Sequence, residues 1–182
     1  MNKETSKSAW RTMLGNNLMS ILLHTAISLA YLVIVLMLTS IPEMMGADAI
    51  VTAIIIIGFV LAAGGYVIFS SHYLRPVARG NILSVASLPI GLIAVPIAAG
   101  FLSSNAIWFD GGFDHEMASN LVAFTNSPAA FTAGGLYSLV ASPIEPHSRT
   151  PFSLLIIAAF IPSLLMYVGM RLKLSRETKA RL

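Results

Sequence analysis

Residues 19–41, MSILLHTAISLAYLVIVLMLTSI, contain no Asp, Glu, Lys or Arg. A helix of about 20 apolar residues crosses a hydrocarbon core about 30 Å thick, so this segment is long enough to span a membrane. Residues 49–70, 82–102 and 152–170 are three more uncharged apolar segments of similar length. The sequence therefore predicts an all-α polytopic membrane protein, a four-transmembrane-helix bundle.

The composition of the whole chain agrees with this prediction. Of its 182 residues, 56% are hydrophobic and 10% are charged, and the mean hydropathy is +0.80. A soluble domain carries about a quarter of its residues as charged side chains, and a disordered chain is poor in apolar residues. Both classes are excluded, and we expect residues 1–182 to form a single integral membrane domain in contact with the lipid bilayer. The absence of cysteine also excludes disulfides and thiolate chemistry.

Lysine and arginine are concentrated in three of the segments outside the predicted spans. All but one of the eleven lie in the N-terminal segment, in the loop between the second and third spans, or in the tail that begins at Arg171. Short loops rich in these residues stay on the cytoplasmic side, so we expect a multi-pass protein of the cell membrane with both termini in the cytoplasm. The tail can also attract anionic lipid headgroups. This placement is not the basic patch of a nucleic-acid-binding surface, and no nucleic acid partner is expected.

The long outer loop, residues 103–151, is expected to carry a short helical extracytoplasmic cap. Residues 119–142 are uncharged, but a fifth span there would place the basic tail outside, against the charge rule. Asp114 is a suitable N-cap for one short helix, and Ser127-Pro128 matches the start of a second. Whether this pair lies on the outer leaflet or re-enters it stays open at this point.

The first predicted span carries a polar stripe on one side. At about 100° per residue its members fall within one arc. They are Asn17, Ser20, His24, Ser28, Tyr31 and Thr39. Polar side chains in a helix bundle usually form hydrogen bonds across helices, and this is the favoured interpretation. The alternative is that His24 relays protons or contacts a permeating solute, because ionisable residues within a membrane are often functional.

Small residues and prolines indicate how the other spans pack and bend. The second span has three small residues on one side, a spacing that lets helix backbones approach closely: Gly58, Ala62 and Gly65. A proline inside a helix removes a backbone donor. We therefore expect the third span to break or bend at Pro89 and Pro96, and the fourth at Pro162.

The outer loop holds the one cluster of side chains typical of site chemistry. Its members are Asp110, Asp114, His115 and Glu116, with Glu145 and His147 later in the same loop. Carboxylates and imidazole can hold a divalent cation or act as acid and base. The spacing matches neither H-E-x-x-H nor an EF-hand loop, so the favoured interpretation is a solvated acidic turn, and no metal or cofactor is expected.

No sequence motif identifies a reaction or a substrate, and three function classes remain. The leading hypothesis is a non-enzymatic accessory, assembly or protective subunit that packs against a membrane protein partner or a second copy of itself. The absence of charge within the spans and the small-residue stripe favour it. The second is a small-solute transporter or channel subunit, with His24 and the third span lining a path. The third is a membrane enzyme that uses the outer-loop cluster.

Overall fold

The structure, a computed structural model, describes residues 3–76, 82–105, 114–141 and 152–180. Every regular element in these ranges is helical, which confirms the predicted all-helical class. The elements are α1 (Lys3–Met44), α2 (Asp48–Tyr73), the short 3-10 helix η1 (Leu83–Val85), α3 (Ser87–Asn105), α4 (His115–Thr125), α5 (Ser127–Ala141), α6 (Phe152–Ala158) and α7 (Ile161–Lys179).

Three helical segments are long and apolar enough to cross a membrane. They are Ser8–Met44 in α1, Asp48–Tyr73 in α2, and Ser153–Lys179, which joins α6 and α7 across a turn. They overlap the first, second and fourth predicted spans and extend beyond each of them at one end or both. The chain is therefore a membrane protein with long apolar helices.

The third predicted span is shorter than expected. Its apolar helix covers Ser87–Leu102, because η1 and Ala86 precede it. The start of α3 is set by Asn17, whose Oδ1 accepts hydrogen bonds from Ser87 N at 3.0 Å and from Ser87 Oγ at 2.7 Å. The side chain of Asn17, which is distant in sequence, thus sets the residue at which α3 begins. No local pattern in residues 82–102 indicates this starting point.

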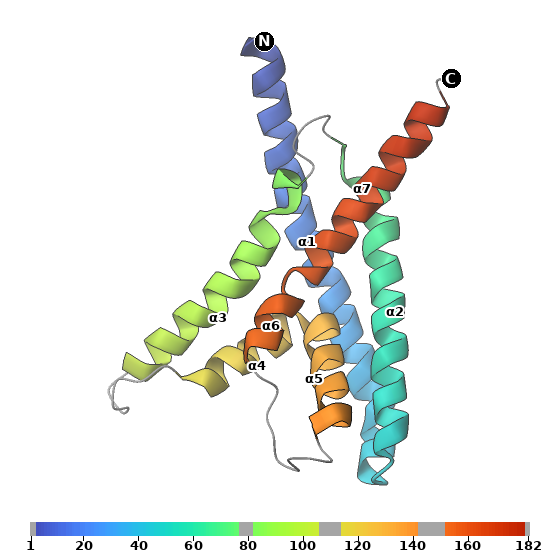
Figure 1. Cartoon of the computed structure of the whole chain (residues 1–182), viewed down its shortest axis with the longest axis vertical. Helices are drawn as coiled ribbons and strands as arrows, with labels where there is room; N and C mark the ends of the chain where they lie inside the picture. The colour runs from blue at the N-terminus through green and yellow to red at the C-terminus, as the bar shows by residue number, and fades with distance from the viewer. Residues whose placement is uncertain (1–2, 77–81, 106–113, 142–151, 181–182) are drawn as a thin grey trace.

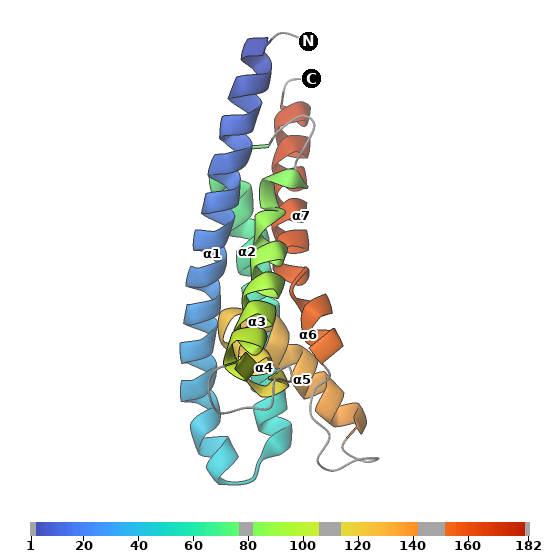
Figure 2. The same ribbon diagram turned by 90° about the vertical axis from the view of Figure 1, so that its left-hand side faces the viewer.

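The helices form an elongated bundle with the two chain ends at the same end (Figures 1 and 2). α1, α2 and α7 run lengthwise, and α3 diverges from α1 toward the opposite end (Figure 1). α1 has 42 residues, so it is about 63 Å long and extends beyond the thickness of a hydrocarbon core. Arg11 lies near the end that holds the termini, whereas Glu43 and Asp48 flank the turn at the other end. The bundle therefore separates its charges along its length.

Two asparagines of α1 hold the chain between α2 and α3. Asn16 Nδ2 donates to Arg75 O at 2.8 Å, and Arg75 N donates to Asn16 Oδ1 at 3.0 Å. Asn17 Nδ2 donates to Leu83 O at 2.8 Å. From α7, Lys173 Nζ donates to Leu74 O at 3.2 Å, beyond the C-terminal end of α2. These side chains satisfy backbone groups that the helices leave unpaired.

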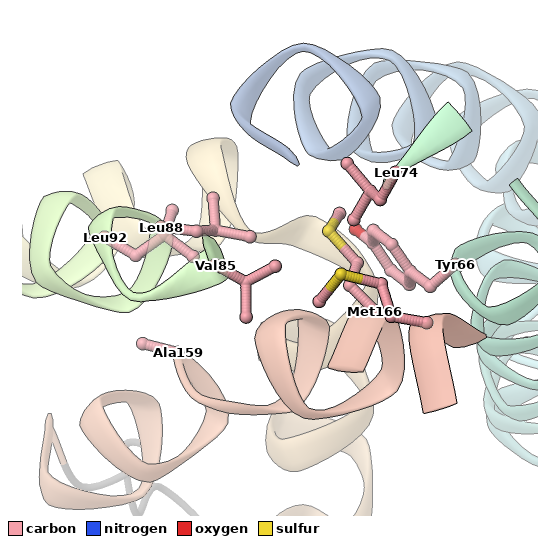
Figure 3. Close-up of a cluster of buried hydrophobic side chains, with 8 residues drawn as sticks. Tyr66, Leu74, Val85, Leu88, Leu92, Ala159 and Met166 are labelled. Carbon is pink, nitrogen blue, oxygen red and sulfur yellow. The ribbon is translucent and has the colours of Figure 1, made fainter. Parts of the chain in front are cut away.

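The largest apolar cluster joins α2, α3 and α7 (Figure 3). Met166 packs between Tyr66 and the side chains contributed by η1 and α3. The closest approach of α2 and α7 is at Gly169, where a β-carbon would overlap Ser70 Oγ and the carbonyl oxygen of Val67. Gly169 is an isolated glycine without a small-residue pattern around it, so the sequence does not indicate this contact.

The small-residue side of α2 faces α1. A β-carbon on Gly58 would lie 3.0 Å from Tyr31 Cε2, and Ala62 is buried in a cluster with Tyr31 and Val35. Near Gly65, the closest atom of another helix is Ile27 Cδ1, which would lie 3.9 Å from such a β-carbon. These residues therefore serve helix packing within the chain.

The prolines lie at three different kinds of position. Pro96 is inside α3, which runs unbroken to Asn105, and Pro89 is in the first turn of that helix. A first-turn residue has no intrahelical acceptor for its N–H, so Pro89 interrupts no hydrogen bond. Pro162 follows the interruption between α6 and α7 and begins the second of these helices. The fourth predicted span is thus divided in two, whereas α3 is continuous through Pro96.

Candidate functional site

The helices α4 and α5 form a hairpin whose turn lies inside the bundle. Asp114 caps α4, since Met117 N donates to its Oδ1 at 2.8 Å, and α5 begins at Ser127-Pro128. Both starts agree with the positions predicted from the sequence. The connecting residue Asn126 and its neighbours through Ala130 are all buried. The turn of this hairpin, residues 125–130, is called the hairpin tip below.

The hairpin tip contacts the interruption between α6 and α7. Asn126 Nδ2 donates to Ala158 O at 3.1 Å, next to the residues where the helix is interrupted. Asn126 Oδ1 is fully buried and has no hydrogen-bond partner in the described parts of the chain. Four helix ends therefore meet at one place, the C-terminal ends of α4 and α6 and the N-terminal ends of α5 and α7.

His24 of α1 lies against the hairpin tip and is 3% exposed. Its Nε2 is 2.9 Å from Thr125 O, and its Nδ1 is 2.8 Å from Tyr66 Oη. A carbonyl oxygen can only accept, so Nε2 carries a proton, and in a neutral imidazole Nδ1 then accepts from the Tyr66 hydroxyl. One neutral imidazole thus links α1 to α2 and α4, with both of its nitrogens hydrogen-bonded.

Ser28 extends this network by one helical turn. Its Oγ lies 3.3 Å from Tyr66 Oη and 3.4 Å from His24 Nε2, and its backbone carbonyl accepts from Ser127 Oγ at 2.8 Å. The Tyr66 proton is directed to His24, so the Ser28 hydroxyl donates to Tyr66. The four side chains His24, Ser28, Tyr66 and Ser127 are called the polar cluster below.

The other stripe residues of α1 form separate hydrogen bonds. Ser20 Oγ donates to Asn17 O, Tyr31 Oη donates to Ile55 O, and Thr39 Oγ1 donates to Val35 O. Only His24 and Ser28 of the predicted stripe therefore lie in the polar cluster. Tyr66 and Ser127 were not predicted as members of this site, because Tyr66 stands in an otherwise apolar span and Ser127 matches a helix cap.

The outer-loop candidates do not form a described site. Asp110 lies outside the described residues, as do Glu145 and His147. Asp114 caps α4, and His115 and Glu116 are exposed in the first turn of that helix. Across the described ranges, no three His, Asp or Glu side chains are grouped as a metal site would need.

A cavity of about 280 Å³ lies beside the polar cluster, between α1, α3 and α4. His24, Ser28 and Thr125 are on its polar side, and Leu88 and Leu92 of α3 are on its apolar side. Gly91 also lines it, and a β-carbon there would meet nothing within 4 Å. The volume is close to the lower limit of ordinary ligand pockets, about 300 Å³, so it suits a small molecule.

Comparison with known proteins identifies no relative: no family model, curated protein or solved structure matches the chain.

Proposed function

We propose that this protein is a transporter or channel subunit that binds a small solute beside His24. The observation that carries the proposal is the meeting of four helix ends at the polar cluster, deep in the bundle. Interrupted helices expose backbone groups within a membrane only where protein or a water-filled cavity covers them. Transporters use such helix ends to bind solutes. The cavity beside His24 supplies the space.

The depth of the site supports this function. His24 is near the middle of the uncharged part of α1, which runs from residue 12 to residue 42. Its position relative to Arg11 and Glu43 places the polar cluster about 20 Å from one charged end and about 28 Å from the other, at 1.5 Å per residue. A solute bound there would lie within the hydrocarbon core, about 9 Å to the cytoplasmic side of the middle of residues 19–41, and transporters bind their substrates near the bilayer midplane.

The accessory-subunit hypothesis was favoured by two sequence features, and one of them, the small-residue stripe of α2, is used for packing within the chain. Gly58 and Ala62 pack against α1 of the same chain and are not available to a partner. The enzyme hypothesis depended on the outer-loop cluster, of which Asp114 is engaged as a helix cap. Neither hypothesis uses the polar cluster, whereas a solute-binding role does.

The proposed topology has four crossings and a re-entrant hairpin. α3 has 19 residues and is about 28 Å long, close to the thickness of a hydrocarbon core. With α3 as a crossing helix, both termini lie on the cytoplasmic side of the cell membrane, and α4 and α5 enter from the outer side. The basic tail then faces anionic lipids. Because four helices enclose little space, we propose that the working unit is an oligomer or a complex with another membrane protein.

Single-cysteine labelling tests this proposal, since the chain has no cysteine of its own. Ser28→Cys places a thiol in the polar cluster, and Leu36→Cys places one on the exposed apolar face of the same helix. Thiol reagents require the thiolate, which forms in water and not in lipid. We expect a polar thiosulfonate reagent to modify Ser28→Cys in proteoliposomes while Leu36→Cys stays unmodified. Equal inertness of the two thiols would show that water does not reach the site, and the proposal would be wrong.

A further inference from the structure

The cavity beside His24 opens toward the side of the bundle. Its outer wall is formed by large apolar side chains that are more than half exposed: Leu29 at 55%, Val95 at 55% and Phe124 at 63%. These residues come from α1, α3 and α4, and the α1 part of the wall lies within its uncharged stretch. α3 diverges from α1 on this side (Figure 1). In the proposed topology this opening of the cavity therefore faces the bilayer.

Each of three hydroxyl groups on the cavity wall donates its hydrogen bond to an acceptor within the chain. Thr25 Oγ1 donates to Ile21 O at 2.9 Å, and Thr125 Oγ1 donates to Leu121 O at 2.7 Å. Ser87 donates to Asn17 Oδ1 at 2.7 Å. A hydroxyl has one hydrogen and two lone pairs, so each of these oxygens can still accept.

The remaining polar groups on the wall follow the same pattern. The Ser28 hydroxyl donates to Tyr66, and the proton of His24 Nε2 is directed to Thr125 O. The described side chains that line the cavity thus offer hydrogen-bond acceptors and no unused donor. None of them is Asp, Glu, Lys or Arg, so a charged ligand would have no counter-ion in a membrane environment where an unpaired charge is costly.

From this combination we infer that the cavity binds an uncharged amphiphile that enters from the bilayer. Its polar head is a hydrogen-bond donor, a hydroxyl or an amide N–H, and contacts the acceptor oxygens of Thr25, Ser87 or Thr125. Its apolar chain lies against Leu88 and Leu92 and leaves through the side opening. The inference rests on the proposed function, because it names the class of solute bound at the same site.

Photolabelling of the full chain in phosphatidylcholine nanodiscs tests the inference. One probe is a long-chain alcohol with a diazirine in its chain, and the matched probe has a methyl group in place of the hydroxyl. We expect saturable labelling of the cavity-lining parts of α1, α3 and α4 by the alcohol only. Dodecanol should compete with the alcohol probe, whereas dodecane and dodecyl sulfate should not.

Two variants locate the binding. Gly91→Leu fills the cavity and should abolish saturable labelling, whereas Gly64→Leu, at an exposed position of α2 that is also open to a β-carbon, should not. Thr125→Val keeps the side-chain shape and removes an acceptor, so it should reduce the preference for the alcohol over the alkane probe. This second variant keeps the inference testable where Gly91→Leu does not fold.

The results that overturn the inference differ from those that overturn the proposed function. Equal labelling by both probes, competition by dodecyl sulfate, or full labelling of Gly91→Leu would show that the ligand class or the site is wrong. If Ser28→Cys is still modified by the thiosulfonate reagent, the transport proposal stands without this solute class. Saturable alcohol labelling together with an inert Ser28→Cys would instead indicate an amphiphile site in a protein that does not transport.

Discussion

His24 in α1 and Thr125 at the C-terminal end of α4 are joined by a hydrogen bond of 2.9 Å across 101 residues of sequence. The carbonyl oxygen of Thr125 belongs to the last turn of its helix, where backbone acceptors have no intrahelical partner. His24 supplies the missing donor and at the same time accepts from Tyr66. Together with the hydrogen bonds from Ser127 Oγ to Ser28 O and from Asn126 Nδ2 to Ala158 O, this side chain holds the hairpin tip at its depth in the bundle.

Replacing Tyr66 by Phe tests the linkage between α1 and α2. The variant keeps the ring in the apolar cluster but removes the hydroxyl that donates to His24 Nδ1 at 2.8 Å. Hydrogen bonds between membrane helices contribute about 0.6 kcal/mol each on average. The Tyr66 hydroxyl makes two, with His24 and Ser28, so we expect a loss of about 1 kcal/mol in the free energy of unfolding. Thermal unfolding in detergent micelles measures it. Tyr73→Phe, which alters an exposed tyrosine, is the control, and an equal loss there would contradict the role of the bond.

A methyl group at Gly169 should disrupt the crossing of α2 and α7. Gly169→Ala places a β-carbon on Ser70 Oγ and on the carbonyl oxygen of Val67, and backbone atoms cannot move aside. Overpacking typically costs about 1–3 kcal/mol, which exceeds the helix propensity of about 1 kcal/mol that alanine gains over glycine. We expect a lower unfolding temperature for Gly169→Ala and an unchanged or higher one for Gly64→Ala, where the space is open. A stabilised Gly169→Ala would show that the helices do not cross there.

Loss of Asn17 should loosen the start of α3. Asn17→Ala leaves Ser87 N and Leu83 O without their side-chain partner. An unsatisfied buried donor or acceptor costs about 1–3 kcal/mol. The bond to Ser87 N is part-buried and the bond to Leu83 O is exposed, so we expect a cost in the lower half of that range. Hydrogen–deuterium exchange of peptides containing residues 82–90 should accelerate. The exposed Asn120→Ala in α4 is the control and should leave both exchange and unfolding unchanged.

The N-cap of α4 can be tested by a pair of substitutions at one residue. Asp114→Ala removes the oxygen that accepts from Met117 N, and a lost N-cap costs about 1 kcal/mol. Asp114→Asn keeps an oxygen at the same place and should restore most of that stability. Circular dichroism during thermal unfolding gives both values. If Asn and Ala destabilise equally, the charge of Asp114 rather than its capping geometry is what matters.

Four single-cysteine variants distinguish four crossings from three. Ala47→Cys and Glu116→Cys should react with an impermeant maleimide from one side of a sealed vesicle, and Arg75→Cys and Ala180→Cys from the other. Residues 75 and 116 fall on opposite sides only if α3 crosses the membrane. Labelling of Arg75→Cys and Glu116→Cys from the same side would refute α3 as a crossing helix and with it the four-span topology.

Much of the fold follows from local physical rules that operate within a single segment. An uncharged apolar stretch such as residues 19–41 must form a helix in lipid, because no other backbone conformation satisfies its hydrogen bonds there. Asp114 begins α4, and Ser127-Pro128 begins α5, since each residue acts on backbone groups within its own helix turn. These elements were predictable because their causes lie a few residues apart.

The site could be predicted only in part. The periodicity of α1 placed His24 and Ser28 on one side of the helix, and that direction was sufficient to predict that this side avoids lipid. It could not identify Tyr66 or Thr125 as partners, which are 42 and 101 residues away along the chain. A polar stripe on one helix shows which side of that helix makes contacts, but it does not identify the residues on the other helices that it contacts.

The sequence by itself determined that this is a membrane protein of long apolar helices, because the absence of charge and the length of each segment act one segment at a time. The tertiary structure decided that α3 starts at Ser87, that the small residues of α2 face α1, and that the hairpin tip meets the interruption between α6 and α7. Each of these depends on a hydrogen bond or a close contact between distant residues. Such contacts exist only after the helices have packed, so no single segment encodes them.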